Sequence, residues 1–92
     1  MSRNAISAED WASYAAELGQ RLNRARVAGG LSQEDVAYGA GLSRYTYQKF
    51  EKGESRPGTP SNPHLRTLLA IAGALGIPPS ELLPEWNPPV KP

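Results

Sequence analysis

The segment from Ser43 to Lys52 holds the side chains whose types and spacing point most clearly to chemistry. Because each residue of a helix advances by about 100°, a helix over this segment turns Tyr47 and Phe50 to one side. The opposite side carries cations and hydrogen-bonding groups, namely Tyr45, Gln48, Lys49 and Lys52. A helix face of this composition suits an anionic polymer, although an ordinary solvated face has a similar composition.

The composition argues against catalytic and metal-binding chemistry. The chain has no cysteine, and His64 is its single histidine. Disulfides, zinc fingers, iron–sulfur clusters and thiol chemistry are therefore excluded. His64 has no partner residues that suggest a catalytic site, and we expect it at the surface near a helix start. The sequence also has no glycine-rich phosphate loop, so we expect neither an enzyme nor a cofactor.

Length and charge are consistent with one small globular domain. The chain has 92 residues, of which 39% are hydrophobic, and its net charge is +1. Eight basic residues and four acidic ones lie between Arg21 and Arg66, whereas the flanks hold two basic and five acidic residues. A basic middle favours an anionic partner, and ordinary surface charge is the alternative. The sequence has no long apolar run and no signal peptide, so we expect no membrane association and a cytoplasmic location, at the nucleoid.

Capping residues, glycines and prolines divide the chain into five expected helices and no strand. Residue 19 is a glycine inside the first helix, which leaves its continuity from 8 to 28 open. The segment 57–63 is expected to be a loop and 84–92 an irregular, proline-rich tail. In chain order, the helices are expected to start at Ser7, Ser32, Ser43, Asn62-Pro63 and Pro79. They are expected to end, in the same order, at Gly29-Gly30, at Gly39 or Gly41, at Gly53, at Gly76 and at Leu83.

Apolar spacing predicts the core. On the first helix the expected core positions are Trp11, Ala15, Leu18, Leu22 and Ala25. On the fourth helix they are Leu65, Leu68, Leu69, Ala72 and Leu75, and near the fifth they are Ile77, Leu82 and Leu83.

The second and third helices are joined tightly enough to leave the third one protruding. Ala37 is small where the two helices must cross, and Gly41 can adopt the positive φ of a sharp turn. A protruding helix about 10–12 Å across fits the major groove of B-DNA, which is about 12 Å wide. Double-stranded DNA is therefore the anionic polymer that this arrangement favours.

The run GLSQEDVA…AGLSRYTYQKFEKG, followed by LRTLLAIAGALGIPPSELL, resembles the helix-turn-helix domain of phage repressors and Cro proteins, the Xre-type regulators. The resemblance covers about Leu18 to Leu83. It implies an all-α, compact five-helix bundle of the lambda-repressor-like type over 17–83, with its helix-turn-helix helices at about 33–40 and 43–52. Residues 1–16 would extend the first helix, and 84–92 would form the tail.

The same resemblance implies roles for single residues. Gln33 matches a position that anchors a DNA phosphate, and Arg26 and Glu51 match an internal salt bridge. The positions that face bases are Ser43, Arg44, Tyr45, Gln48 and Lys49. Arg44 can bind guanine O6 and N7 with two hydrogen bonds, and Lys49 can reach guanine or the backbone. Lys52 is a further candidate for a phosphate contact.

The sequence departs from the family in three places. Tyr47 stands where an aliphatic residue is usual, so its hydroxyl needs either a hydrogen-bond partner or access to water. The segment 54–62 is longer than the usual link and is either a proline-stiffened connector or a clamp on the DNA backbone that uses Ser55, Arg56 and Thr59. The extension over 1–16 adds Trp11 and Tyr14, either as extra core or as a dimer surface.

We therefore expect a sequence-specific DNA-binding transcriptional regulator, a repressor acting by steric exclusion. One recognition helix covers few base pairs, so we expect a homodimer on an inverted repeat. Two alternatives remain at this point: an antitoxin or other module whose main ligand is a second protein, and a helical bundle with no role on DNA.

Overall fold

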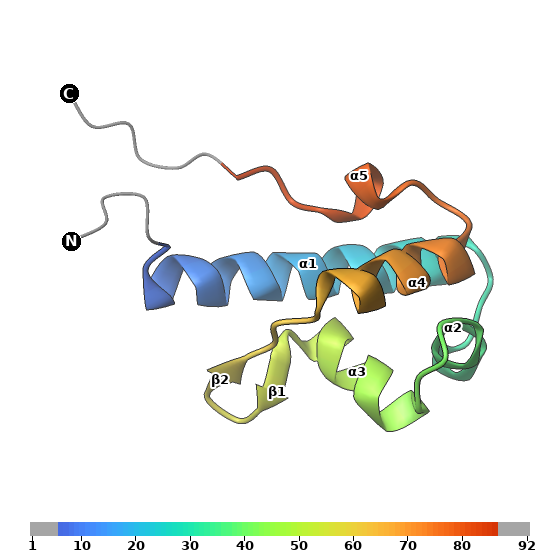
Figure 1. Cartoon of the computed structure of the whole chain (residues 1–92), viewed down its shortest axis with the longest axis horizontal. Coiled ribbons are helices and arrows are strands. Elements are labelled where there is room, and N and C mark those ends of the chain that lie inside the picture. The colour runs from blue at the N-terminus through green and yellow to red at the C-terminus, as the bar shows by residue number, and fades with distance from the viewer. Residues whose placement is uncertain (1–5, 87–92) are drawn as a thin grey trace.

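The computed structural model describes residues 6–86 and contains, in that part of the chain, five helices and one short two-stranded sheet. The expected all-α bundle is confirmed, and the sheet is an addition to it. Helix α1 (Ala8–Ala28) extends along the molecule, with α3 (Arg44–Lys52) and the strands on one side of it (Figure 1). Helix α3 packs against α1 and α2 (Gln33–Gly39), and α2 packs against α4 (Leu65–Leu75).

Helix α1 is continuous through Gly19, which answers the question left by the sequence. It begins where the Ser7 hydroxyl accepts a hydrogen bond from the Asp10 backbone N–H at 3.0 Å. A Cβ atom at Gly19 would lie 2.7 Å from the Phe50 carbonyl oxygen and would also meet that of Glu51. The glycine therefore lets the end of α3 approach α1 closely, and this approach offsets its unfavourable helix propensity.

The segment after α3 forms a β-hairpin, so the expectation of no strand was wrong. Strand β1 (Glu54–Arg56) pairs antiparallel with β2 (Thr59–Pro60), with Glu54 opposite Pro60 and Arg56 opposite Thr59. Gly58 forms the turn with φ +81°. Such short strands show no alternation in the sequence, because their pairing depends on the turn and on the contact of β2 with α1.

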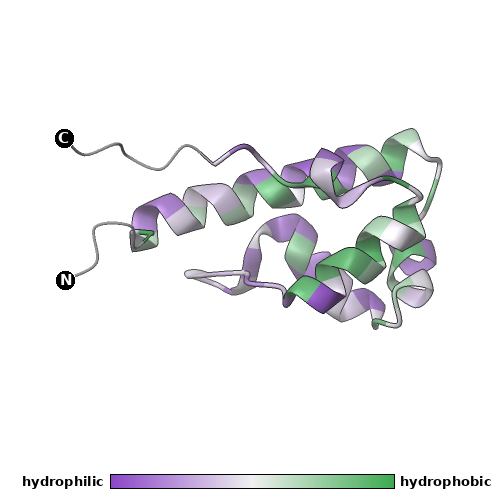
Figure 2. Ribbon diagram, turned by 45° about the horizontal axis from the view of Figure 1, so that its top comes forward, coloured by the Kyte–Doolittle hydropathy of each residue, from purple (hydrophilic) through white to green (hydrophobic). Residues whose placement is uncertain are grey.

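The start of α4 and part of its expected core also differ from the prediction. His64 is the N-cap residue, two positions after the expected Asn62, and its side chain makes no capping hydrogen bond. Leu68, Ile71 and Ala72 are the buried residues of α4. Leu65 and Leu69 are 68% and 47% exposed, which contradicts their assignment to the core. Helix α4 is largely hydrophobic along its ribbon (Figure 2), so its sequence alone does not show which of its leucines are covered.

The core lies among all five helices. Its largest buried side chains are Tyr47, Leu22, Ile71, Leu82 and Val36. Helix α5 (Pro79–Leu82) contributes Leu82, whereas Leu83, which was expected to point inward, is 38% exposed. The reason is that α5 ends at Leu82 and the extended backbone at Leu83 turns its side chain outward.

The first residues after α5 pack along α1. The Tyr14 ring stacks on Trp11 with centroids 5.7 Å apart and meets the edge of Trp86 at 6.1 Å. Its hydroxyl donates to the Pro84 carbonyl oxygen at 2.8 Å. Trp11 and Tyr14 therefore extend the packing within one chain, which favours the first of the two roles expected for them. Most of the expected tail, 87–92, and residues 1–5 of the extension lie outside the described residues.

Candidate nucleic-acid interface

The outer face of α3 is exposed, while its inner face is anchored in the protein. Tyr47 is fully buried, whereas Tyr45, two residues before it, is 69% exposed. Arg44 and Lys52 are also exposed, and Lys49 is half-buried. The Lys49 ammonium lies 4.2 Å from the centre of the Tyr45 ring, within cation–π distance. The expected exposed face is therefore present, with an aromatic ring and a cation already in contact.

Ser43 serves as the N-cap of α3 in this structure. Its Oγ accepts a hydrogen bond from the Thr46 backbone N–H at 3.1 Å and donates one to Thr46 Oγ1 at 3.0 Å. Its hydroxyl is therefore already used for capping, although it remains exposed beside Arg44. Capping positions the start of α3, where Arg44 and Tyr45 project.

Glu51 joins three helices through its carboxylate. Arg26 Nε donates to Oε2 at 2.6 Å and Arg26 Nη2 to Oε1 at 3.2 Å, so the expected ion pair forms with two hydrogen bonds. The Tyr47 hydroxyl donates to Oε2 at 2.6 Å and is the partner that its burial requires. Asn23 Nδ2 and Gln33 Nε2 each donate to Oε1 at 3.1 Å. We call these five residues the Glu51 network.

This network keeps Glu51 ionised although its side chain is only 6% exposed. Burial alone would raise the pKa of the carboxyl, but hydrogen bonds from Arg26, Tyr47, Asn23 and Gln33 lower that pKa to about 2. Burial and the bond to Glu51 raise the pKa of Tyr47, so this phenol stays a donor. The hydrogen bond to Glu51 also raises the pKa of Arg26.

Gln33 lies at its expected position at the start of α2, but its side chain is already engaged within the protein. It is the first residue of α2 and half-buried, and its side-chain nitrogen already donates to Glu51. One hydrogen of that amide nitrogen remains for a second partner. The structure thus restricts the orientation in which Gln33 can meet a phosphate.

The hairpin stands beside α3 and leaves an open cleft of about 530 Å³ between them. Arg56 Nε donates to Thr59 Oγ1 at 3.3 Å across the hairpin, and Glu54 accepts from the Gly58 backbone N–H at 3.3 Å. The Ser55 hydroxyl faces the Thr59 carbonyl oxygen at 3.5 Å. This hairpin cleft is lined by Tyr45, Lys49, Lys52, Glu54, Ser55, Arg56, Pro57 and Thr59. All three residues expected to form a backbone clamp therefore share one cleft with the recognition helix.

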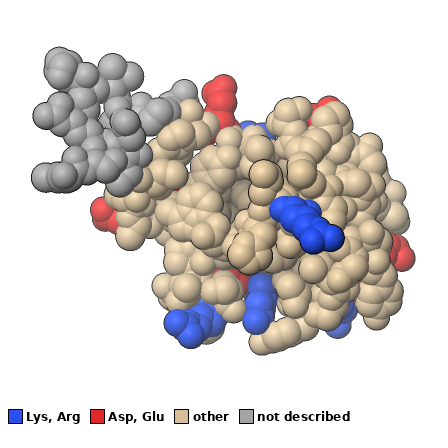
Figure 3. All heavy atoms as spheres, in the orientation of Figure 1, with Lys and Arg blue, Asp and Glu red and all other residues tan. Residues whose placement is uncertain are grey.

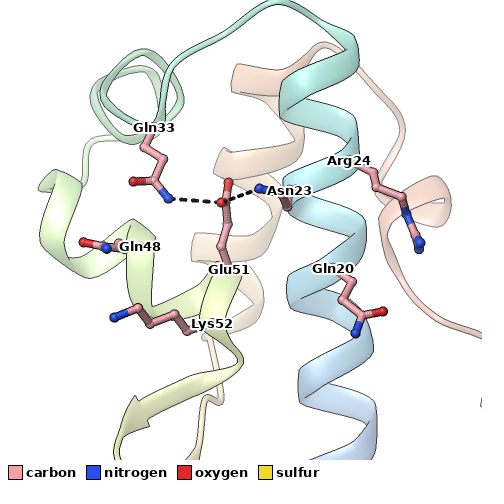
Figure 4. Close-up of a pocket in the computed structure, with 7 residues that line it drawn as sticks. All are labelled: Gln20, Asn23, Arg24, Gln33, Gln48, Glu51 and Lys52. Atoms are coloured by element: carbon pink, nitrogen blue, oxygen red, sulfur yellow. Dashed lines mark hydrogen bonds between the residues drawn. The ribbon is translucent and has the colours of Figure 1, made fainter.

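A second cleft, of about 410 Å³, lies on the other flank of α3 and is bordered by α1. Figure 4 shows Asn23 and Gln33 directed at Glu51 in its middle, with the ends of Lys52 and Arg24 turned outward on opposite sides. We call it the α1–α3 cleft; its lining residues are Gln20, Asn23, Arg24, Gln33, Gln48, Glu51 and Lys52. The sequence interpretation missed Gln20, Asn23 and Arg24, although Asn23 lies one helical turn before Arg26 and faces the same way.

The charged groups are distributed unevenly over the surface. In Figure 3, several Lys and Arg groups lie along the lower edge, which in the same view of Figure 1 is formed by α3 and the hairpin, and another projects from the middle of this face. Among the described residues, no three His, Cys, Asp or Glu side chains come together in a way that could hold a metal ion. Over the same range, no helix has the length and apolar character needed to cross a membrane.

Comparison with known proteins agrees with this geometry. A family model described as a helix-turn-helix domain matches residues 17–85, and the chain belongs to this family. It is 39% identical to the restriction-modification controller protein C.AhdI from Aeromonas hydrophila, with a TM-score of 0.68, and the match covers 77% of this chain and 98% of C.AhdI. The expected helix-turn-helix membership is confirmed.

Two further solved structures share the fold. A hypothetical transcription factor NHTF from Neisseria is 30% identical, with a TM-score of 0.66 and 88% of each chain covered. The wild-type restriction-modification controller protein C.Esp1396I is 20% identical, with a TM-score of 0.63, 75% of this chain and 82% of its own chain covered, and this likeness concerns the fold alone. The search of curated proteins gave no match.

Proposed function

We propose that this protein regulates transcription by binding a specific sequence of double-stranded DNA, with α3 in the major groove. The observation that carries the proposal is the contrast between the two faces of α3. On the inner face Tyr47 is buried and Glu51 accepts hydrogen bonds from α1 and α2. On the outer face Arg44 and Tyr45 stand exposed. A rigidly held helix with free donors on its outer side is what reading base edges requires.

The side chains divide into two roles. Arg44, Tyr45, Gln48 and Lys49, with Ser43 beside them, would face the bases, where Arg44 can bind guanine with two hydrogen bonds. Lys52, Arg56, Ser55 and Thr59 would contact phosphates, because the hairpin cleft places them beside the recognition helix. Gln33 would add a phosphate contact at the start of α2. In this arrangement the protein is a binding protein and needs no cofactor.

The assembly on DNA would be a homodimer on an inverted repeat. A single helix such as α3 reads about four or five base pairs, and two-fold symmetry doubles the site. Leu65 and Leu69 supply an exposed apolar surface on α4 for the contact between protomers. A dimer over a promoter represses by excluding polymerase, and we place this action in the cytoplasm, at the nucleoid.

The likeness to C.AhdI suggests which genes are regulated. C.AhdI is a restriction-modification controller protein, and the match covers 98% of its chain. We infer that this chain controls genes of a restriction-modification system. Co-purification with a stoichiometric second protein that blocks DNA binding would instead favour the antitoxin alternative.

Selection of bound duplexes from a random pool tests the function, and a matched pair of variants tests the roles. Arg44→Ala should relax the preference at one base pair and weaken binding to the selected site by about 1–3 kcal/mol. Arg56→Ala should weaken binding to all sequences alike and lower the slope of log K against log salt by about 0.9. If the pool yields no preferred sequence, or if Arg44→Ala weakens every duplex equally, base reading by α3 is wrong.

A further inference from the structure

The α1–α3 cleft presents hydrogen-bond donors whose orientation is already determined. A carboxylate only accepts hydrogen bonds, so the two amides that contact Glu51 Oε1 must turn their nitrogen atoms to it. Asn23 Nδ2 and Gln33 Nε2 each keep a second hydrogen that this oxygen does not use. Two N–H donors from α1 and α2 are thus held next to each other at the cleft.

The acid in this cleft does not repel an anion strongly. Glu51 is paired with Arg26 at 2.6 Å and receives hydrogen bonds from Tyr47, Asn23 and Gln33. The other charged groups that line the cleft are Arg24 and Lys52, both exposed. Neither forms an ion pair with any residue between 6 and 86. The cleft therefore combines fixed neutral donors with two exposed cations, which suits a phosphate group.

The position of the cleft relative to α3 identifies the source of that phosphate. A helix that fills the major groove has one sugar–phosphate strand on each of its flanks. The hairpin cleft lies on one flank of α3 and the α1–α3 cleft on the other, and Lys52 lines both. If α3 enters the groove as proposed above, the second strand must pass the α1–α3 cleft.

We propose that the α1–α3 cleft binds a phosphodiester of the DNA strand opposite the hairpin, and that Asn23 and Arg24 of α1 are its contacts. This inference rests on the proposed function and extends the interface to a helix outside the helix-turn-helix pair. Asn23 would donate the amide hydrogen that Glu51 leaves free. Arg24 would swing from its outward position to pair with the phosphate charge.

The test compares Asn23→Ala and Arg24→Ala with Arg66→Ala, a matched control on α4 that is exposed and lines neither cleft. Affinity is measured for the duplex selected by the wild type and for a random duplex, over a series of salt concentrations. Both cleft variants should weaken both duplexes about tenfold and leave their ratio unchanged. Arg24→Ala should also lower the salt slope by about 0.9, whereas Asn23→Ala should not change it.

A neutral methylphosphonate, introduced at one backbone position at a time, locates the contact. At the phosphate bound by the cleft it should weaken the wild type and have little further effect on Asn23→Ala. The proposal is overturned if both cleft variants bind like Arg66→Ala, or if the methylphosphonate effects fall on the hairpin side alone. A wild type without sequence preference would contradict the proposed function. The affinities of the cleft variants for the random duplex would then test the phosphate site independently of that function.

Discussion

At the scale of single residues, the carboxylate of Glu51 connects stability to the DNA-facing surface. It receives donors from α1, α2 and α3, so the helices that carry the candidate contacts are tied to one buried charge. A buried ion pair of this kind is costly to break from one side, because the remaining charge stays without a partner. Replacing Glu51 with a neutral residue would leave the charge of Arg26 without its ion-pair partner.

The lowered pKa of Glu51 predicts acid sensitivity. Folding shifts this pKa from 4.5 to about 2, so between these values the unfolded chain binds the proton and the folded protein does not. Stability from this group is present above about pH 4.5 and is lost as the pH falls toward 2. Glu51→Gln should lower the free energy of unfolding at pH 7 by about 3 kcal/mol.

Urea unfolding at pH 7 and pH 3 checks this prediction. The free energies of unfolding of the wild type and Glu51→Gln should differ less at pH 3 than at pH 7. The reason is that the wild type loses at low pH the contribution of the ionised Glu51, which the variant lacks at both pH values. Glu34→Gln, an exposed position on α2, serves as the control and should keep the pH dependence of the wild type. An equal difference at both pH values would show that the charge of Glu51 is not its source.

At the scale of elements, the recognition helix is positioned by two glycines. Gly19 allows the backbone of Phe50 and Glu51 to lie directly against α1. A Cβ at Gly53 would lie 2.9 Å from the Cα of Ala16. Gly53 also has φ +77°, which ends α3 and starts the hairpin. The close approach of α3 to α1 and the direction of the hairpin therefore both depend on glycine, which has no Cβ, at these two positions.

Two glycine-to-alanine substitutions test this packing against helix propensity. Gly19→Ala should lower the free energy of unfolding by about 3 kcal/mol, because backbone atoms cannot move away from the new methyl group. Gly73→Ala on α4 meets nothing within 4 Å and should raise it by about 0.5–1 kcal/mol. Denaturant titrations followed by circular dichroism measure both values. If Gly19→Ala left the free energy of unfolding unchanged, α1 and α3 would not be in close contact.

At the scale of the whole molecule, the apolar and the basic surfaces would serve different partners in the proposed assembly. Leu65 and Leu69 lie one turn apart on α4 and are exposed, whereas the cationic side chains of the two clefts lie on α3 or beside it. Apolar surface of this kind is stabilised when a second copy covers it. The proposed dimer would place two α3 helices about 34 Å apart on one face of the duplex.

Leu69→Glu should disrupt this dimer without disturbing the fold, because the side chain is 47% exposed. Sedimentation of the free protein should show a monomer where the wild type is a dimer, and the affinity for an inverted repeat should fall to that for one half-site. Val27→Glu, at an apolar residue of α1 that is 61% exposed, is the matched control and should remain dimeric. Solution scattering that shows one protein chain bound per operator would refute the dimer.

The sequence by itself determined the first three helices and the exposed face of α3. Ser7, Ser32 and Ser43 cap the helices that they predict, because capping and helical periodicity act over a few neighbouring residues. The pair between Arg26 and Glu51 followed from the family resemblance and is present in the structure.

Only the tertiary structure decided which surfaces those elements share. The hairpin, the exposure of Leu65 and Leu69, and the position of Asn23 beside Gln33 all depend on residues far apart in the chain. A helical pattern shows that one side is apolar, but the neighbours of α4 decide how much of that side is covered. The clefts beside α3 likewise exist because α1 and the hairpin meet it from different parts of the sequence, and no local spacing encodes such a meeting.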